Sequence, residues 1–85
     1  MNITFTQTGW NDYIYWQTQD KRTTKKINKL IKSIESNGPI KGEGHPEFLK
    51  HIKAYSRHID EKNRLVYKYT KTDVIVLACV GHYED

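Results

Sequence analysis

Residues 64–80 read RLVYKYTKTDVIVLACV, and this stretch decides the fold. Its two ends, RLVYKYT (64–70) and VIVLACV (74–80), are rich in the β-branched and aromatic residues that favour strands. The three residues between them, Lys71-Thr72-Asp73, have the length of a hairpin connection. We therefore predict two antiparallel strands joined by a tight turn.

The residues before this hairpin predict two more strands and a loop. Residues 55–60 alternate Tyr, Arg and Ile with Ser, His and Asp, and Glu61-Lys62 has the length of a two-residue turn. A short strand is predicted at residues 49–52. Residues 40–48, IKGEGHPEF, contain two glycines and a proline, so we predict a loop, where reacting groups are often found.

The first half of the chain predicts a short strand and two helices. Residues 2–6 alternate as a half-buried strand does. Thr8 is predicted to cap a helix that runs to about Gln19, and Asp20 to cap a second helix that ends at residues 37–39, Asn-Gly-Pro. The apolar stripe of the second helix consists of Ile27, Leu30, Ile31 and Ile34.

The element order is β-α-α-β-β-β, which predicts an α+β fold. Two N-terminal helices packed on one face of a mostly antiparallel sheet would bury the apolar side chains of both layers. The chain has 85 residues, enough for one domain. We expect residues 1–85 to form that single domain.

The composition limits the classes of protein to consider. A net charge of +4 suits a polyanionic partner, although it also suits a merely solvated basic surface. No apolar stretch approaches the roughly 20 residues that a membrane span needs, and the N-terminus lacks signal-peptide features. The single cysteine, Cys79, excludes an internal disulfide and lies in an apolar run, which indicates a buried, inert thiol. We expect a cytoplasmic protein.

The predicted hairpins bring three basic side chains together. In the register of the two-residue turn, Ile59 lies opposite Arg64, and Arg57 lies diagonal to Arg64 on the same face. In the register of the three-residue turn, Arg64 lies opposite Val80, and His82 points to that face just past the strand end. A one-residue slip would reverse these faces, so the cluster of Arg57, Arg64 and His82 depends on the register.

Two guanidinium groups and an imidazole suit chemistry at a phosphate. The guanidinium groups can bind phosphate oxygens bidentately, and an imidazole can donate or accept a proton. Spacing alone favours the simpler interpretation that the arginines are solvated strand charges and that His82 belongs to a frayed terminus. Glu47, in the glycine-rich loop, is by the same reasoning either a general base or an ordinary exposed carboxylate. The four histidines show no metal-ligand spacing, so we expect no metal site.

Six segments give the chain a resemblance to a known family. They are residues 10–16 (WNDYIYW), 25–32 (KKINKLIK), 42–51 (GEGHPEFLKH), 56–59 (SRHI), 64–67 (RLVY) and 82–83 (HY). In this order they resemble the YoeB/Txe toxins of the RelE superfamily nearly from end to end. The resemblance implies the RelE-like toxin fold.

The resemblance also implies a function and partners. It implies a ribosome-dependent endoribonuclease of a type II toxin-antitoxin system, which inhibits translation by cutting mRNA in the ribosomal A site. The implied partners are the ribosome with its mRNA and a YefM/Axe-type antitoxin, and operator DNA would be bound only through that antitoxin. Toxins of this branch are often homodimers, and neither a cofactor nor a membrane is implied.

The family's motif supplies the catalytic set. Its loop Glu, its strand Arg, and its terminal His and Tyr match Glu47, Arg64, His82 and Tyr83. RNA carries its own nucleophile, the 2′-hydroxyl, so neither a metal nor a covalent residue is required, and cleavage would leave a cyclic phosphate. We expect Glu47 to act as the base and His82 as the acid. Arg64, together with Arg57, would stabilise the charge on the phosphate.

Further contacts with RNA are expected from Lys50, His51, Lys53, Tyr55, Arg57 and His58. The chain departs from the family in three places: residues 52–55 form a shorter segment, His58 replaces the family's second Arg, and Glu84-Asp85 follow the terminal Tyr. Two alternatives to a nuclease remain open. One is a non-catalytic module that binds ribosomes, or DNA as a co-repressor with its antitoxin. The other is a gyrase inhibitor, which would not require His82.

Overall fold

The structure is a computed structural model and describes residues 1–82. Its elements in chain order are β1 (Asn2–Phe5), α1 (Gln7–Gln19), α2 (Lys21–Asn37), β2 (Glu47–Leu49), β3 (Ala54–His58), β4 (Arg64–Tyr69) and β5 (Asp73–Ala78). Tyr83, Glu84 and Asp85 lie outside the described residues.

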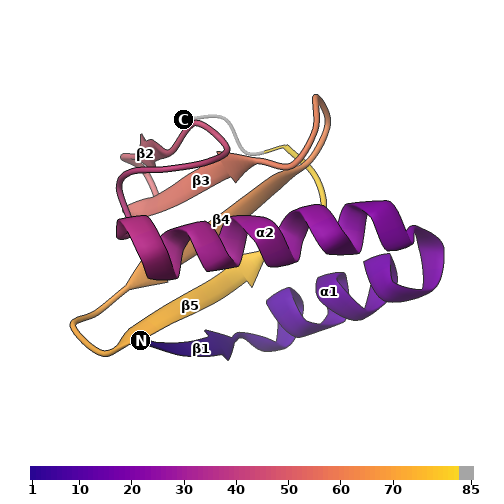
Figure 1. Cartoon of the computed structure of the whole chain (residues 1–85), viewed down its shortest axis with the longest axis horizontal. Coiled ribbons are helices and arrows are strands. Elements are labelled where there is room, and N and C mark those ends of the chain that lie inside the picture. The colour runs from indigo at the N-terminus through magenta and orange to yellow at the C-terminus, as the bar shows by residue number, and fades with distance from the viewer. Residues whose placement is uncertain (83–85) are drawn as a thin grey trace.

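The five strands of residues 1–82 form one sheet in the order β1-β5-β4-β3-β2. β1 is parallel to β5, whereas every other neighbouring pair is antiparallel. Figure 1 shows both helices on one face of this sheet, with α2 crossing in front of β4 and β5. The predicted α+β fold, with two N-terminal helices on a mostly antiparallel sheet, is confirmed.

The helix boundaries are set by side-chain caps. The predicted cap of α1, Thr8, is wrong by two residues, because Thr6 has the extended backbone of a cap and its hydroxyl accepts the N–H of Gly9 at 3.0 Å. Asp20 caps α2 as predicted, with its carboxylate accepting the N–H of Arg22 at 3.0 Å. Gly38 ends α2 with a φ of 89° and donates its N–H to the Ile34 carbonyl.

The main core lies between α2 and the sheet. The predicted apolar stripe of α2 is buried, and Ile27, Leu30 and Ile34 have no exposed surface. Its partners on the sheet include Leu65, Tyr67, Val74 and Val76, which are also fully buried. A second, smaller cluster of Leu49, Ala54, Val66 and Ala78 lies apart from this core. The sheet therefore has a helix-covered face and a helix-free face, with different environments.

The register between β3 and β4 differs by one residue from the prediction. His58, and not Ile59, lies opposite Arg64. Ile59 then donates its N–H to the Asn63 carbonyl, so the turn contains the three residues 60–62. The Asp60 carboxylate holds this turn by accepting the N–H groups of Lys62 and Asn63, at 2.8 and 2.7 Å. A slip of one residue reverses the face of every side chain, so the predicted pairing of Arg57 with Arg64 on one face is wrong.

The register between β4 and β5 departs from the prediction in two ways, which offset each other at the pair Val66–Ala78. The turn has two residues and not three, since Thr70 bonds to Asp73 and Tyr69 pairs with Val74. A β-bulge then shifts the register between Val66 and Tyr67. Beyond the bulge, Val66 pairs with Ala78 as predicted, whereas the Arg64 N–H donates to the carbonyl of Gly81, one residue past the predicted partner Val80, at 2.9 Å.

The predicted loop at residues 40–48 and strand at 49–52 are each displaced by about two residues. β2 already begins at Glu47 and ends at Leu49, where it pairs with Ala54. Residues 50–53 form the turn into β3. This early start matters for function, because it places Glu47 on a strand and not on an irregular loop.

Candidate active site

Three of the predicted site residues point to the helix-free face of the sheet. Across β2 and β3, Glu47 lies opposite Ser56, and across β3 and β4, His58 lies opposite Arg64. Ser56 and His58 are two residues apart on one strand and so share a face. The backbone register therefore brings Glu47, His58 and Arg64 to one side of three neighbouring strands.

Arg64 contacts His82 directly. Nη2 of Arg64 lies 2.8 Å from Nε2 of His82, and Nη1 donates to the Asp60 carbonyl at 2.7 Å. A guanidinium group can only donate, so Nε2 of His82 is the acceptor in this contact. The structure thus brings together the two residues that both the predicted register of β4 and β5 and the family motif had joined.

Glu47 lies between two imidazoles. Its Oε1 is 3.4 Å from Nε2 of His58 and 3.7 Å from Nε2 of His45. The two rings are edge to face, with centroids 5.7 Å apart. The side chain of Glu47 is about half exposed, at 49%. The carboxylate is thus accessible to a ligand on this face while one of its oxygens is already oriented by His58.

His45 was missed as a neighbour of Glu47 by sequence reasoning. It lies two positions before Glu47, just ahead of β2, with a left-handed backbone (φ 56°). That conformation is uncommon for a residue other than glycine, and it cannot be read from residue type. The one indication in the sequence that His45 could lie near Glu47 is its place two positions earlier in the same glycine-rich segment.

Arg57 occupies the opposite face and contributes to the structure in a different way. Its side chain is fully buried, and its guanidinium group donates five hydrogen bonds. The acceptors are the Tyr67 hydroxyl, the Ser33 hydroxyl, and the carbonyl oxygens of Gly38, Lys41 and Glu43, at 2.6–3.1 Å. The prediction that Arg57 joins Arg64 at a phosphate is wrong, because Nε, Nη1 and Nη2 of Arg57 all donate to acceptors within the protein.

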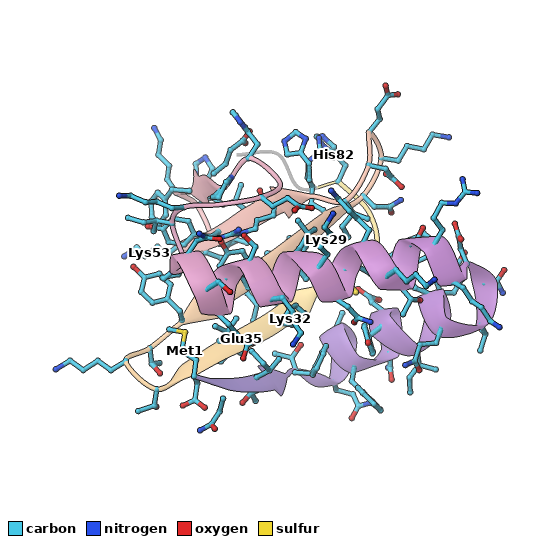
Figure 2. All side chains as sticks on the ribbon, viewed as in Figure 1. Met1, Lys29, Lys32, Glu35, Lys53 and His82 are labelled. Atoms are coloured by element: carbon cyan, nitrogen blue, oxygen red, sulfur yellow. The ribbon has the colours of Figure 1, made fainter. Side chains whose placement is uncertain are left out.

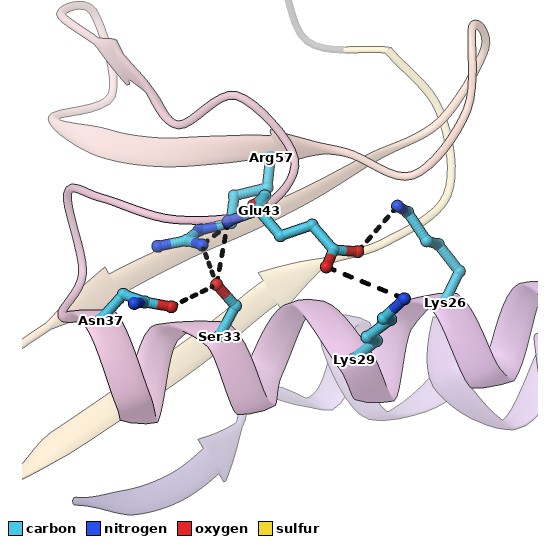
Figure 3. Close-up of polar contacts among 6 residues, drawn as sticks. All are labelled: Lys26, Lys29, Ser33, Asn37, Glu43 and Arg57. Carbon is cyan, nitrogen blue, oxygen red and sulfur yellow. Dashed lines mark hydrogen bonds and ion pairs between the residues drawn. The ribbon is translucent and has the colours of Figure 1, made fainter.

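The loop that Arg57 holds leads directly into β2 and Glu47. Figure 3 shows Glu43 of this loop between Arg57 and α2, where its carboxylate pairs with Lys26 at 3.0 Å and more loosely with Lys29 at 4.0 Å. The hydrogen bond from Lys26 is the main reason that the pKa of Glu43 is below its ordinary value. The Ser33 hydroxyl also accepts the N–H of Glu43 at 2.9 Å. The loop is therefore fixed to α2 through Glu43 and to β3 through Arg57.

The remaining predicted RNA contacts are divided between two places. Lys50, His51 and Lys53 lie in the exposed turn between β2 and β3. In Figure 2, Lys53 lies at the opposite end of β3 from His82. Tyr55 pairs with Tyr67 across β3 and β4 and so points to the helix-covered face, away from Glu47. Tyr83, the fourth member of the expected catalytic set, lies outside the described residues.

Tyr55 belongs to an aromatic group on the helix-covered face. Its ring centroid lies 5.2 Å from that of Phe48, 5.7 Å from that of Tyr69 and 6.1 Å from that of Tyr67. Burial, and then the neighbouring Tyr69, raise the pKa of Tyr55. Tyr55 therefore lies on the opposite face of the sheet from Glu47 and Arg64, and its contact with RNA stays a prediction.

Within residues 1–82, no three His, Cys, Asp or Glu side chains are grouped so that they could hold a metal ion. In the same residues, no helix is both long and apolar enough to cross a membrane. Every buried side-chain nitrogen or oxygen in this part of the chain has a hydrogen-bond partner.

The chain is similar to a well-defined group of bacterial toxins. Residues 5–83 match the family model described as the YoeB-like toxin of bacterial type II toxin-antitoxin systems. The YoeB toxins of Escherichia coli K12 and Streptomyces coelicolor are 45% and 46% identical over 85 residues, covering 98% of this chain and all of each relative.

The chain is also similar to solved structures of bacterial toxins. The YoeB dimer of Staphylococcus aureus superposes with a TM-score of 0.92 at 44% identity, and 98% of each chain is covered. The toxin in a heterotetrameric YoeB-YefM toxin-antitoxin complex of the same organism gives 0.90 at 44% identity, with 98% of each chain covered. Escherichia coli YafQ shares only the fold, at 17% identity and a TM-score of 0.77, with 95% of this chain and 92% of that one covered.

Proposed function

Because the chain belongs to the YoeB-like toxin family of bacterial type II toxin-antitoxin systems, we propose that it is an endoribonuclease that cuts mRNA on the ribosome. It would act in the cytoplasm and inhibit translation by cleaving in the ribosomal A site. The observation that carries the proposal is the contact of Arg64 with His82, on the face to which Glu47 also points.

The reaction needs three groups and no external nucleophile. Glu47 takes the proton of a 2′-hydroxyl, whose oxygen attacks the adjacent phosphorus. Arg64 stabilises the negative charge of the pentacoordinate phosphate. His82 gives a proton to the 5′-oxygen as its bond to phosphorus breaks. The products are a 2′,3′-cyclic phosphate on one fragment and a 5′-hydroxyl on the other.

The Arg64–His82 contact supports a proposed order of events at the acid. While Nη2 of Arg64 donates to Nε2 of His82, that nitrogen carries no proton. A phosphate that binds Arg64 competes for the same guanidinium, because charge-assisted bonds to phosphate are stronger than bonds to a neutral imidazole. Release from Arg64 would leave Nε2 of His82 available to the 5′-oxygen. Substrate binding and activation of His82 are thereby coupled.

We propose that RNA binds to the helix-free face of the sheet, where Glu47, His58 and Arg64 lie. His58 lies between Glu47 and Arg64, where it orients the carboxylate and would lie beside the scissile phosphate. Lys50, His51 and Lys53 in the exposed turn would bind the RNA backbone. Tyr83 would complete the catalytic set.

The partners follow from the relatives. The Staphylococcus aureus relative has been solved as a dimer and in a complex with YefM. We propose a YefM-type antitoxin and a homodimer for this chain as well, with operator DNA bound only through the antitoxin. Ribosomes and mRNA are the proposed targets of the toxin once the antitoxin is removed.

The test is cleavage of a defined mRNA on purified ribosomes by wild type, Glu47→Gln and His82→Ala. We expect each substitution to lower the cleavage rate by at least about 10²-fold, the typical contribution of a proton-transfer group. Glu35→Gln, at an exposed carboxylate of α2, is the matched control and should cut at the wild-type rate. Wild-type rates in both site variants, with unchanged circular dichroism, would refute the catalytic assignment.

The products and the substrate provide a second test. Fragments with a 2′,3′-cyclic phosphate are expected, and naked RNA should be cut far more slowly than mRNA on ribosomes. Equal rates on both substrates would contradict ribosome dependence. Tight ribosome binding by the wild type without any cleavage would instead support a non-catalytic binding module.

A further inference from the structure

The short segment that carries His82 is fixed by side chains that lie outside the proposed catalytic set. β5 ends at Ala78, and residues 79–81, here called the 79–81 segment, connect it to His82. Backbone N–H groups that leave a sheet need other acceptors. The Asp12 carboxylate supplies one, since its Oδ2 accepts the N–H of Cys79 at 2.9 Å and that of Val80 at 3.3 Å.

α1 contributes a second bond to the same segment. The indole Nε1 of Trp16 donates to the Cys79 carbonyl at 2.8 Å. Asp12 and Trp16 are four positions apart and so lie on one side of the helix. The carboxylate and the indole together bind the donor and the acceptor of one backbone residue, Cys79, from one helix face. Burial, and then the charge of Asp12, raise the pKa of the Cys79 thiol to about 12.

The β3–β4 turn binds the segment from the other side. Oδ1 of Asn63 accepts the Gly81 N–H at 2.9 Å, and the Arg64 N–H donates to the Gly81 carbonyl at 2.9 Å. Gly81 has a φ of 96°, a conformation that is strained for other residues. The chain direction at Gly81, and with it the position of His82 beside Arg64, is therefore defined by bonds from both sides.

We infer that Asp12 is a positioning residue for His82, an inference that rests on the proposed function of His82 as the acid. Asp12 accepts two of the three N–H groups of the 79–81 segment, so its loss would loosen the segment next to β5. The bond from Trp16 to the Cys79 carbonyl, and those of Asn63 and the Arg64 N–H to Gly81, would remain as weaker restraints. The catalytic imidazole would sample more positions relative to Arg64, and the rate of proton transfer would fall because its geometry is seldom correct.

Three variants of the full chain test the inference. Asp12→Ala removes the acceptor, Asp12→Asn keeps a neutral acceptor, and Asn11→Ala is the matched control on the exposed side of α1, where Asn11 contacts Gln7. We expect Asp12→Ala to lower kcat for ribosomal mRNA cleavage about tenfold or more with little change in KM. Asp12→Asn should recover part of this loss, and Asn11→Ala should match wild type.

Two measurements by NMR separate positioning from a general loss of stability. Amide hydrogen exchange of Cys79 and Val80 should accelerate about tenfold or more in Asp12→Ala, while core amides of β4 keep their protection. The ring signals of His82 should shift as its contact with Arg64 is lost for part of the time. Unchanged His82 signals, or a kcat equal to that of wild type, would overturn the inference, as would equal acceleration of exchange throughout the protein.

These readouts also distinguish the inference from the proposed function. If the wild type fails to cut mRNA, the proposed function is wrong, yet the exchange rates and His82 signals still report whether Asp12 positions the imidazole. If the wild type cuts and Asp12→Ala moves the His82 signals without lowering kcat, the inference fails while the proposed function stands.

Discussion

The two faces of the sheet each contain an arginine, and the two arginines have different environments. Arg57 and Arg64 are seven positions apart, on neighbouring strands. On the helix-covered face, Arg57 has no exposed surface and donates all its bonds to the loop before β2, to α2 and to Tyr67. On the helix-free face, Arg64 donates to turn carbonyls and contacts His82. Strand parity, and not residue type, therefore separates the structural guanidinium of Arg57 from that of Arg64, which we propose to be catalytic.

The largest effect is expected from removing Arg57. Arg57→Leu leaves several polar groups of the loop without their donor, and we expect the free energy of unfolding to fall by about 3–5 kcal/mol. That is a large part of the roughly 5–15 kcal/mol that stabilises a typical domain. Urea denaturation measures the loss. If Arg57→Leu does not fold, Arg57→Lys provides the measurement, because it keeps the charge but loses the planar guanidinium group. Its free energy of unfolding should lie between those of wild type and Arg57→Leu.

Arg64→Leu is the matched experiment on the other face. Arg64 is only 9% exposed, but its acceptors at Asp60 and Glu61 lie in an exposed turn, so we expect a smaller loss of about 1–3 kcal/mol in stability. Cleavage on ribosomes should instead fall about 10²–10³-fold, as it does when one charge-stabilising group is removed from an active site. Equal losses of stability in the two variants would remove the distinction between the faces.

A second large effect is expected at Gly44, where the loop lies against the helix-covered face. Gly44 has a φ of 89°, and an added Cβ would lie 2.6 Å from Cδ2 of Leu30 and 3.0 Å from Cβ of Arg57. Backbone strain and overpacking together predict that Gly44→Ala lowers the free energy of unfolding by about 2–4 kcal/mol. Gly38→Ala is the control, since a Cβ there meets nothing within 4 Å and only the strain remains. Thermal unfolding of both variants provides the comparison.

A smaller effect is expected from alkaline pH. On the helix-covered face, burial raises the pKa of Tyr67 and also that of Cys79, the latter from 9.0 to about 12. A raised folded-state pKa gives stability that is complete below the unfolded pKa and is lost as the pH rises towards the folded value. Cys79 alone should therefore cost about 2 kcal/mol between pH 9 and pH 11. Cys79→Ala should flatten the pH dependence of urea denaturation in this range, and an unchanged slope would contradict the prediction.

The sequence predicted what depends on local residue patterns. The spacing of apolar residues predicted both helices, and it also predicted the buried stripe of α2. The family motif and the register of β4 and β5 both joined Arg64 to His82, and these two side chains are in contact. This success depended partly on a cancellation, because the shorter turn and the bulge shift the register in opposite directions.

The sequence could not predict what depends on a single turn or on contacts distant along the chain. The environment of Arg57 follows from the length of the β3–β4 turn, which the Asp60 side chain holds through its bonds to turn N–H groups. The bonds of Asp12 to the 79–81 segment join residues 67 and 68 positions apart. No periodicity within α1 carries that information, although the spacing of Asp12 and Trp16 could have identified a shared helix face.

The smallest effect is expected from Glu43, which belongs to the Arg57 region but is partly exposed. The hydrogen bond from Lys26 lowers the pKa of Glu43 below its ordinary value of 4.5. A lowered folded-state pKa gives stability that is present above the unfolded pKa and is lost as the pH falls through the folded value. Wild type should thus be slightly more stable than Glu43→Gln at pH 6, and the difference should vanish near pH 2. High salt should also reduce it, because exposed ion pairs are screened. A difference as large as that of Arg57→Leu would show that the ion pair, and not the buried guanidinium, holds the loop before Glu47.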